Sequence, residues 1–156
     1  MMPYNSLTWQ SNCVSDNTYR SWDSNDYGPA PLAINIVHDT IRNPTFLTTR
    51  WTGYHMQLIL MSIPVNGDIG LENHPGADQF IRIEKGEGLL FMGNSPYNLS
   101  FQQPVNDNCA VIIPANTWHN LINTGDNPLK LYSIYSPSWY PSGTAYGKKR
   151  ENGTVE

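Results

Sequence analysis

Short apolar stretches alternate with turn-forming residues along most of the chain. Within each stretch, β-branched and aromatic residues tend to recur at every second position, and Gly, Pro, Asn and Asp separate the stretches. This pattern is typical of β-strands, and the spacing of an amphipathic helix is nearly absent. We predict strands at 33–37, 46–52, 55–63, 72–74, 79–84, 88–92, 99–102, 108–113, 119–123 and 129–135, with one helical turn at 39–43.

Turn residues separate the predicted strands. Gly67-Asp68, Gly76–Asp78, Lys85-Gly86 and Gly125–Pro128 supply the reversals, because Gly tolerates a positive φ and Asn or Asp bonds back to its own backbone. Antiparallel strands that close into a jelly-roll barrel pair most of their edges and enclose an interior that holds a small ligand. We therefore expect an all-β jelly-roll barrel over residues 31–142.

The two ends of the chain differ from this barrel pattern. Residues 1–30 are rich in Asn, Ser, Asp, Tyr and Trp and contain almost no Ile, Leu or Val. We expect a leader that stays extended or disordered until it packs on something, either a barrel edge or a neighbouring subunit. Residues 143–156, with the cations at 148–150, are predicted to form a flexible tail.

Composition narrows the class of protein. With 156 residues the chain has the size of one domain, and a net charge of −4 gives no basic patch for nucleic acid. The longest apolar run is shorter than the roughly 20 residues that a membrane helix needs, and the N-terminus has no secretory pattern. We expect a cytoplasmic protein in which Cys13 and Cys109 are free thiols, the latter buried as a small apolar residue.

Candidate chemistry lies between Gly70 and Gly86. Side chains alternate across a strand, so Glu72 and His74 project from one face, and a reversal after His74 brings Gln79 of the next strand back toward them. Imidazole, carboxylate and amide oxygen form a mixed nitrogen and oxygen site, which suits divalent Mn, Fe, Co, Ni or Zn without selecting one of them.

The same stretch resembles the first motif of the cupin superfamily. That motif runs Gly, five residues, His, one residue, His, three or four residues, Glu, six residues, Gly. Glu72 stands at the first His, His74 at the second, Gln79 at the Glu and Gly86 at the closing Gly. The opening Gly is represented by Gly67, one residue closer than the consensus spacing.

The second cupin motif is also present with its spacing intact. Pro114, His119 and Asn123 match it, and Asn108 and Asn116 stand where the motif has Gly. Asn is among the residues that best tolerate a left-handed backbone, so both exchanges are mild. The resemblance covers residues 55–135 and is greatest to small single-domain bacterial cupins, some of which are loosely labelled sugar-phosphate isomerase-like.

The resemblance implies a metal held by Glu72, His74, Gln79 and His119. Compared with a site of three His and one Glu, one imidazole is lost, and the single negative charge moves from the Glu position to residue 72. The alternative is a cupin without metal, whose four side chains bond one another or a ligand. Asp78 is a weaker candidate ligand because it projects to the opposite face of its strand.

Residues around this set have less certain roles. His55 and Gln57 share a face of the preceding strand, and we expect His55 to form a polar wall of the cavity and to act with Glu72 in moving a proton. We expect His38 at the surface and Arg50, Arg82 and Lys130 outside the barrel. The aromatic residues Tyr54, Trp118, Tyr132 and Tyr135 fit either a pocket or an ordinary core or interface.

The sequence offers no competing catalytic motif such as a phosphate loop or nucleophile elbow. We therefore expect a metal-dependent enzyme that acts on a small polar metabolite inside the barrel, for example a sugar or keto-acid isomerase. A non-haem metal dioxygenase is the first alternative, because two His and one carboxylate are its usual ligands. A non-catalytic ligand-binding or structural assembly module is the second. We expect a homodimer in each case.

Overall fold

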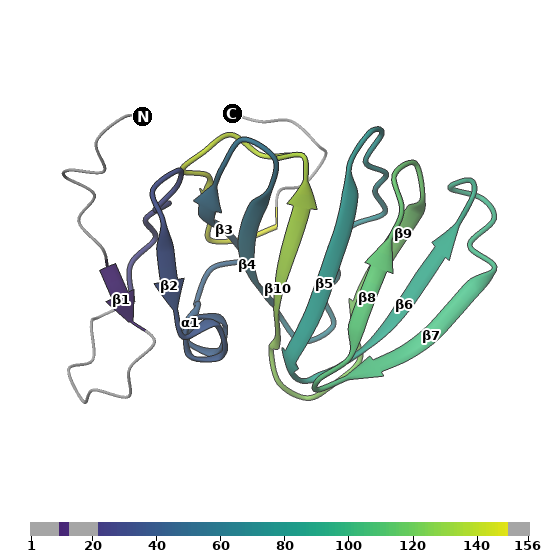
Figure 1. Ribbon diagram of the computed structural model, residues 1–156. Helices are drawn as coiled ribbons and strands as arrows, with labels where there is room; N and C mark the ends of the chain where they lie inside the picture. The colour runs from purple at the N-terminus through teal and green to yellow at the C-terminus, as the bar shows by residue number, and fades with distance from the viewer. Residues whose placement is uncertain (1–9, 13–21, 150–156) are drawn as a thin grey trace.

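The computed structural model describes residues 10–12 and 22–149 (Figure 1). Its elements are β1 (Gln10–Asn12), β2 (Leu32–Ile34), α1 (Ile36–Arg42), β3 (Leu47–Thr52), β4 (Gln57–Ile63), β5 (Asp78–Lys85), β6 (Glu87–Gly93), β7 (Phe101–Asn106), β8 (Ala110–Ile113), β9 (Trp118–Asn123), β10 (Leu129–Ser136) and β11 (Ala145–Tyr146). Within these residues, no helix has the length and apolar character needed to cross a membrane.

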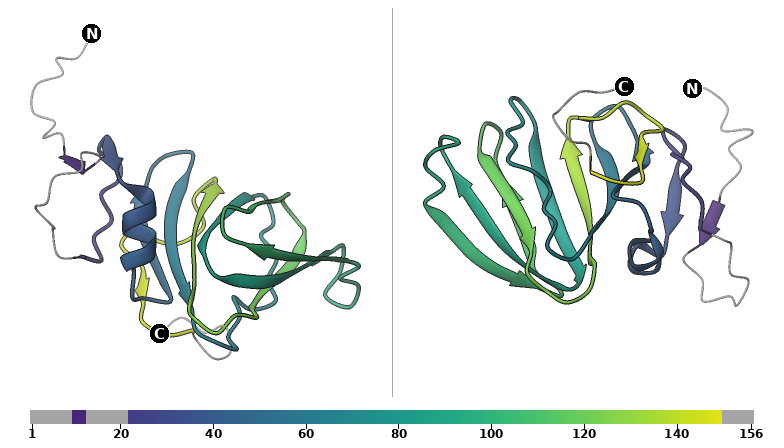
Figure 2. Two further views of the ribbon diagram at one scale, coloured as in Figure 1. Left: turned by 90° about the horizontal axis from the view of Figure 1, so that it is seen from below. Right: turned by 180° about the vertical axis from the view of Figure 1, so that it is seen from behind.

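Two antiparallel sheets form a jelly-roll barrel, which confirms the predicted all-β class. The larger sheet has the strand order β11-β3-β4-β10-β5-β8, and the smaller has the order β7-β6-β9. Figures 1 and 2 show the two sheets curving around a common interior, with α1 and the short parallel pair β1-β2 outside the larger sheet. The tight hairpin between β5 and β6 turns at Gly86, whose φ is +112°.

The core fills the space between the sheets. Alternate residues of each strand face inward, as Ile59, Met61 and Ile63 do on β4, and the intervening residues face outward. The inward set is closely packed and almost entirely aliphatic: Leu47, Ile59, Ile63, Ile81, Ile83, Leu90, Ile113, Leu121, Leu129 and Leu131 are all at most 2 % exposed. This aliphatic core fills most of the interior, and the buried polar side chains of the site lie at one end of the barrel.

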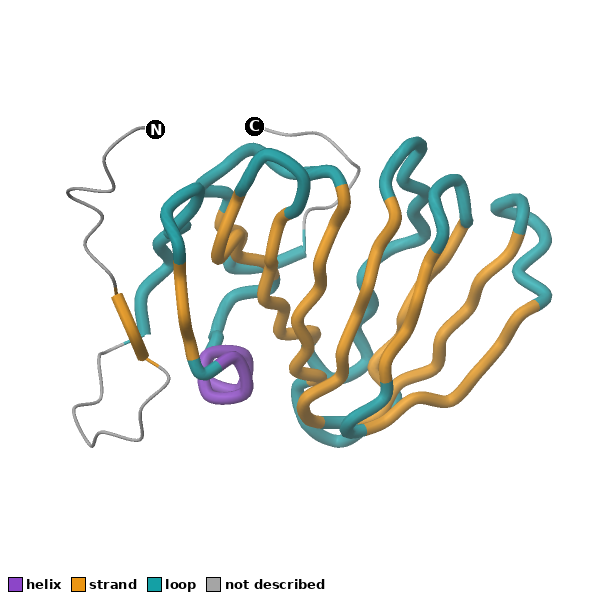
Figure 3. Tube along the Cα trace, viewed as in Figure 1, coloured by secondary structure: helices purple, strands orange, loops and turns teal. Residues whose placement is uncertain are grey.

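The first predicted strand is shorter than expected, and the predicted helical turn is a full helix. Strand β2 ends at Ile34 because Asn35 caps α1, and its side chain accepts a hydrogen bond from His38 N at 3.1 Å. Asp39 in the first turn and Arg42 in the last turn interact favourably with the helix dipole, which is positive at the N-terminus and negative at the C-terminus. Helix formation therefore takes residues 36 and 37 from the predicted strand (Figure 3).

The predicted strand at 72–74 is wrong. Residues 64–77 run beside β9 as an irregular segment with single bridges, Asp68 to Ile122 and Glu72 to His119. Gly70, with φ of +98°, turns the chain out of the extended conformation between these bridges, and no regular ladder forms. The segment still carries its side chains into the barrel.

Segments on both sides of residues 31–142 pack against the barrel, and a leader that packs on a barrel edge is one of the two arrangements expected from the sequence. Residues 22–30 pack along β3, where Asp26 accepts hydrogen bonds from Thr52 N and Thr52 Oγ1 (2.9 and 2.5 Å), and residues 145–146 form β11 beside the same strand. These segments are polar, so their attachment depends on hydrogen bonds that an apolar pattern cannot predict. The other leader and tail residues, 1–9, 13–21 and 150–156, lie outside the described residues, and so does Cys13. Cys109 is a half-buried free thiol rather than a buried one, because it sits in the turn before β8.

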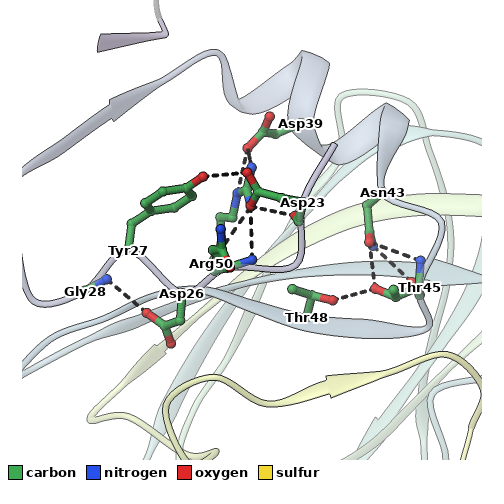
Figure 4. Close-up of polar contacts among 10 residues, drawn as sticks. Asp23, Asp26, Tyr27, Gly28, Asp39, Asn43, Thr45, Thr48 and Arg50 are labelled. Atoms are coloured by element: carbon green, nitrogen blue, oxygen red, sulfur yellow. Dashed lines mark hydrogen bonds and ion pairs between the residues drawn. The ribbon is translucent and has the colours of Figure 1, made fainter. Parts of the chain in front are cut away.

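Arg50 of β3 organises the attachment of the leader. The guanidinium, 3 % exposed, donates to Asp39 Oδ2 at 2.7 Å and to Asp23 Oδ1 at 2.8 Å, and lies 5.0 Å from the centre of the Tyr27 ring (Figure 4). Two carboxylates thus neutralise one buried cation on the outer face of the sheet. Its place outside the barrel interior matches the expectation, and its burial does not follow from the sequence.

Candidate metal centre

Three side chains with metal-ligand chemistry meet at one end of the barrel. Each of Glu72, His74 and His119 offers a ligand atom within 4.8 Å of the others. Glu72 Oε1 lies 3.1 Å from His74 Nε2 and 3.4 Å from His119 Nε2. These are three of the four predicted ligands. The two imidazoles are 3 % and 0 % exposed, so protein encloses them almost fully.

Backbone hydrogen bonds fix the positions of these ligands. Glu72 N donates to His119 O at 3.0 Å and His119 N donates to Glu72 O at 2.9 Å, which ties the two residues across from one another. Asn116 N donates to His74 O at 3.3 Å, and the φ of Asn116 is +63°. Asn108 has a φ of +69°, so both Asn residues adopt the left-handed backbone predicted for the glycine positions.

One ring nitrogen of His119 is committed to the backbone. Its Nδ1 lies 2.8 Å from Thr117 O, and a carbonyl oxygen only accepts, so Nδ1 carries a proton and Nε2 is the nitrogen that faces Glu72. A hydrogen bond from the second ring nitrogen to a backbone carbonyl is the usual support of a metal-binding imidazole. Nε2 is therefore the nitrogen through which His119 is placed to bind a metal.

Gln79 of β5 adjoins the cluster. Its Nε2 donates to Ser133 Oγ at 3.0 Å and to Tyr135 Oη at 2.9 Å, and Tyr135 Oη lies 3.5 Å from His74 Nε2. Gln79 is thus linked to His74 through Tyr135. It faces into the barrel as predicted.

Three buried atoms at this end of the barrel have no hydrogen-bond partner in the described part of the chain: His74 Nδ1, Gln79 Oε1 and His119 Nε2. Buried polar atoms are rarely left unpaired, and each one costs free energy. A cation bound to His119 Nε2 would satisfy one of these three atoms, and the Glu72 carboxylate lies beside the same nitrogen. Two imidazoles and one carboxylate suit a divalent transition metal, so the residues fit the expected cofactor without identifying it.

Electrostatics keep the carboxylate charged. Burial raises the pKa of Glu72, but hydrogen bonds and charge from His119 and His74 together lower it by more. The net pKa therefore lies below its ordinary value. Burial raises the pKa of Tyr135 well above its usual range, so this phenol is neutral. The Glu72 side chain is 26 % exposed and connects the cluster to solvent.

Two aromatic residues beside the cluster were missed by the sequence reasoning. The ring centres of Trp139 and His74 are 4.5 Å apart, and those of Tyr140 and Tyr135 are 5.8 Å apart. Both missed residues belong to the loop that follows β10. The aromatic pair between Pro137 and Pro141 was the available signal, because such residues on a rigid loop commonly line sites.

His55 does not belong to the site, which corrects the catalytic role predicted for it. It is exposed in the turn between β3 and β4, with its ring 4.6 Å from that of Tyr54, because β4 begins at Gln57 and not at residue 55. Gln57 is buried, but its carboxamide bonds the backbone of Trp139 and Tyr140. His55 and Gln57 therefore do not share a strand face, because the predicted strand began two residues before the observed start of β4.

The remaining candidates are not members of the cluster. Asp78 is exposed and accepts a hydrogen bond from Ala115 N at 2.9 Å, as expected for the opposite face of its strand. His38 is half-buried on α1, and Arg82 bonds Glu84 and Asn108 outside the barrel. Tyr54 is 90 % exposed, and the Tyr132 ring packs against Phe80, so neither shapes the pocket.

Comparison with known proteins agrees with this geometry. The cupin domain model matches residues 59–135. The chain is 53% identical to YrkC of Bacillus subtilis, over 84% of this chain and 70% of that protein, and 37% identical to a protein of Acanthamoeba polyphaga mimivirus, over 77% and 74%. The crystal structure of BH2720 from Bacillus halodurans is 54% identical and superimposes with a TM-score of 0.79, over 80% of this chain and 95% of that one. KdgF from Halomonas sp. shares the fold at 12% identity, with a TM-score of 0.52, over 60% and 78%.

Proposed function

The chain belongs to the cupin family, and from this premise we propose that it is an enzyme that binds a divalent transition metal through Glu72, His74 and His119 and acts on a small polar metabolite in the barrel. The observation that carries the proposal is the convergence of these three ligand groups beside buried nitrogen and oxygen atoms that lack partners. Gln79 is the fourth candidate ligand through its free Oε1.

The reaction class that we put first is isomerisation of a sugar or keto acid. A divalent metal supplies Lewis-acid polarisation of a carbonyl oxygen. Glu72 is the charged group of the cluster that reaches solvent, and its lowered pKa keeps it ionised. We assign it as the base by its position, because a lowered pKa weakens a carboxylate as a proton acceptor. Neutral Tyr135 holds Gln79 and contacts His74, and so positions the other side of the site.

A dioxygenase is the second candidate, because two histidines and one carboxylate are the donor set of non-haem iron oxygenases. The metal present in the protein distinguishes the two. Iron favours oxygen chemistry, and zinc favours isomerisation. A binding or assembly cupin remains the outcome if metal is bound and no candidate substrate turns over.

We extend the proposal to a homodimer in the cytoplasm, with a small molecule as the partner inside the barrel. The net charge of −4 supports the absence of a nucleic-acid partner. Light scattering of the purified chain tests the dimer directly, and a monomer at all concentrations would overturn that part.

The decisive experiment is elemental analysis of protein purified without a metal-affinity step. We expect a stoichiometric transition metal in the wild type, and its loss in His74→Ala and His119→Ala. His55→Ala is the matched control, because it removes an exposed histidine outside the cluster and should retain the metal. A metal-free wild type that takes up none of the five metals on reloading would end the proposal.

Activity is tested with the loaded protein against aldoses, ketoses and keto acids, with proton exchange at the carbon next to the carbonyl followed by nuclear magnetic resonance. Glu72→Gln keeps the size of the side chain and removes its charge, so we expect turnover to be lost. Full turnover in Glu72→Gln would show that the carboxylate is not the base.

A further inference from the structure

Trp139 lies beside the proposed site. Its ring and the His74 ring pack edge to face, with centres 4.5 Å apart and planes at 68°, and the residue is 40 % exposed. Glu72 contacts the same imidazole, 3.1 Å from Nε2, and is also partly exposed. A partly exposed carboxylate and a partly exposed indole therefore flank one histidine of the ligand cluster.

The loop that carries Trp139 is firmly held. Gln57 Oε1 accepts from Trp139 N and Tyr140 N at 3.2 and 2.9 Å, and Gln57 Nε2 donates to Tyr140 O at 2.8 Å. Ser138 Oγ donates to Gly53 O at 3.1 Å and completes the attachment. Gln57 itself is 0 % exposed, so the anchor is part of the barrel. The exposed indole is thus pre-positioned, and presenting it costs the ligand no ordering of the loop.

We propose that Trp139 determines ligand specificity by providing an aromatic platform, so that the site takes small oxygen-ligating molecules that also carry a flat or apolar carbon face. This inference rests on the proposed metal site and names the class of molecule that the site prefers. The polar end of such a molecule lies at the cluster, and its carbon face lies on the indole.

The size of the effect follows from the exposed area. Covering roughly 60 Å² of the indole at the usual free energy per buried apolar area corresponds to about a tenfold gain in affinity. A ligand with a carboxylate and no carbon face gains nothing from the platform. The ratio of two affinities therefore isolates the contribution of Trp139.

The test uses the full chain loaded with Co²⁺ and two probes, acetate and benzoate, which share the carboxylate and differ in the ring. Binding is followed by the visible absorption of cobalt and by tryptophan fluorescence. In the wild type we expect benzoate to bind about tenfold more tightly than acetate. In Trp139→Ala we expect the two affinities to become equal, with the acetate affinity unchanged. Tyr97→Ala, which removes an aromatic residue that is 98 % exposed on the β6–β7 connection, is the matched control.

The outcomes separate the two proposals. Cobalt uptake with an unchanged benzoate preference in Trp139→Ala overturns the platform and leaves the metal site intact. A changed cobalt spectrum with loss of both probes also overturns it, because Trp139 would then support His74 and not the ligand. No cobalt uptake by the wild type removes the proposed metal site, and the platform with it.

Discussion

Asp26 connects three segments that are distant in sequence, and replacing it gives a sharp test of how the barrel is closed. Its Oδ1 accepts from Gly28 N and Thr52 N at 3.0 and 2.9 Å. Its Oδ2 accepts from Thr52 Oγ1 at 2.5 Å and from Ser142 Oγ and Gly143 N at 3.1 Å. One carboxylate thus joins the leader, β3 and the loop before β11.

The two obvious substitutions remove different parts of this arrangement. Asp26→Ala removes every acceptor, and we expect a loss of about 3 kcal/mol in the free energy of unfolding, since bonds to a charged group contribute more than neutral ones but several of these donors can turn to water. Asp26→Asn keeps one carbonyl oxygen for Gly28 and Thr52. It sets an amide group against Gly143 N, so we expect a loss of about 1.5 kcal/mol.

The pH dependence supplies the second part of the test. Burial raises the pKa of Asp26, but hydrogen bonds from Thr52, Gly28 and Gly143 lower it further, to below the ordinary value of 3.8. A depressed folded pKa means that the carboxylate contributes stability above the unfolded pKa and loses it as the pH falls through the folded one. The difference between wild type and Asp26→Asn should therefore stay constant from about pH 7 to pH 5 and shrink below about pH 4.

Urea unfolding followed by far-ultraviolet circular dichroism measures both effects. The reasoning is refuted if Asp26→Ala costs less than about 1 kcal/mol, or if the difference for Asp26→Asn grows as the solution is acidified. Lys148→Ala is the control, because it removes an exposed charge close to β11 and none of the hydrogen bonds of Asp26 described above involves Lys148.

Three further changes test the fold, each by urea unfolding. Asn116→Ala should cost about 1 kcal/mol and Asn116→Gly almost nothing, because the φ of +63° disfavours a Cβ-bearing residue other than Asn, and equal losses would contradict this. Arg50→Ala should lower the free energy of unfolding by about 3 to 5 kcal/mol with little dependence on salt, because it leaves Asp23 and Asp39 without their buried cation. A strongly salt-dependent loss would indicate solvated ion pairs instead. Gly86→Ala should lower the free energy of unfolding by more than about 2 kcal/mol, because φ is +112° and the added Cβ would lie 3.2 Å from Leu129 Cα. Gly76→Ala should lower it less, because Gly76 has a φ of +79° and open space around it.

The central strands could be predicted because their apolar alternation is strong. The predicted ranges for β6, β9 and β10 differ from the observed ones by one residue at each end or less, and the inward positions of β4 and β5 are the expected ones. The site was also predictable in part. Glu72, His74, Gln79 and His119 all occur at one end of the barrel, and all four lie within the two sequence motifs.

The errors have a common physical cause. The position of His55 and the backbone at 72–74 both depend on irregular structure and on polar contacts between distant residues. The buried carboxamide of Gln57 binds the backbone of a loop some 80 positions away, and nothing in its local pattern distinguishes it from a cavity residue. Trp139 was missed for the same reason, since its place beside His74 depends on that loop.

The place of β3 in the larger sheet bears on how the protein is made. One neighbour, β4, follows at once in the sequence, but the other lies near the opposite end, and Thr49 N donates to Thr144 O at 2.9 Å across a separation of 95 residues. In a nascent chain, Leu47–Thr49 at the start of β3 therefore lack these partners until almost all of the protein has been synthesised, whereas Asp26 and Tyr27 can bond Arg50 and Thr52 at its end from the outset. Pairings of this range slow folding, and an open edge can recruit strands from other chains. We expect the yield of folded protein to respond more to temperature and expression rate than its final stability suggests.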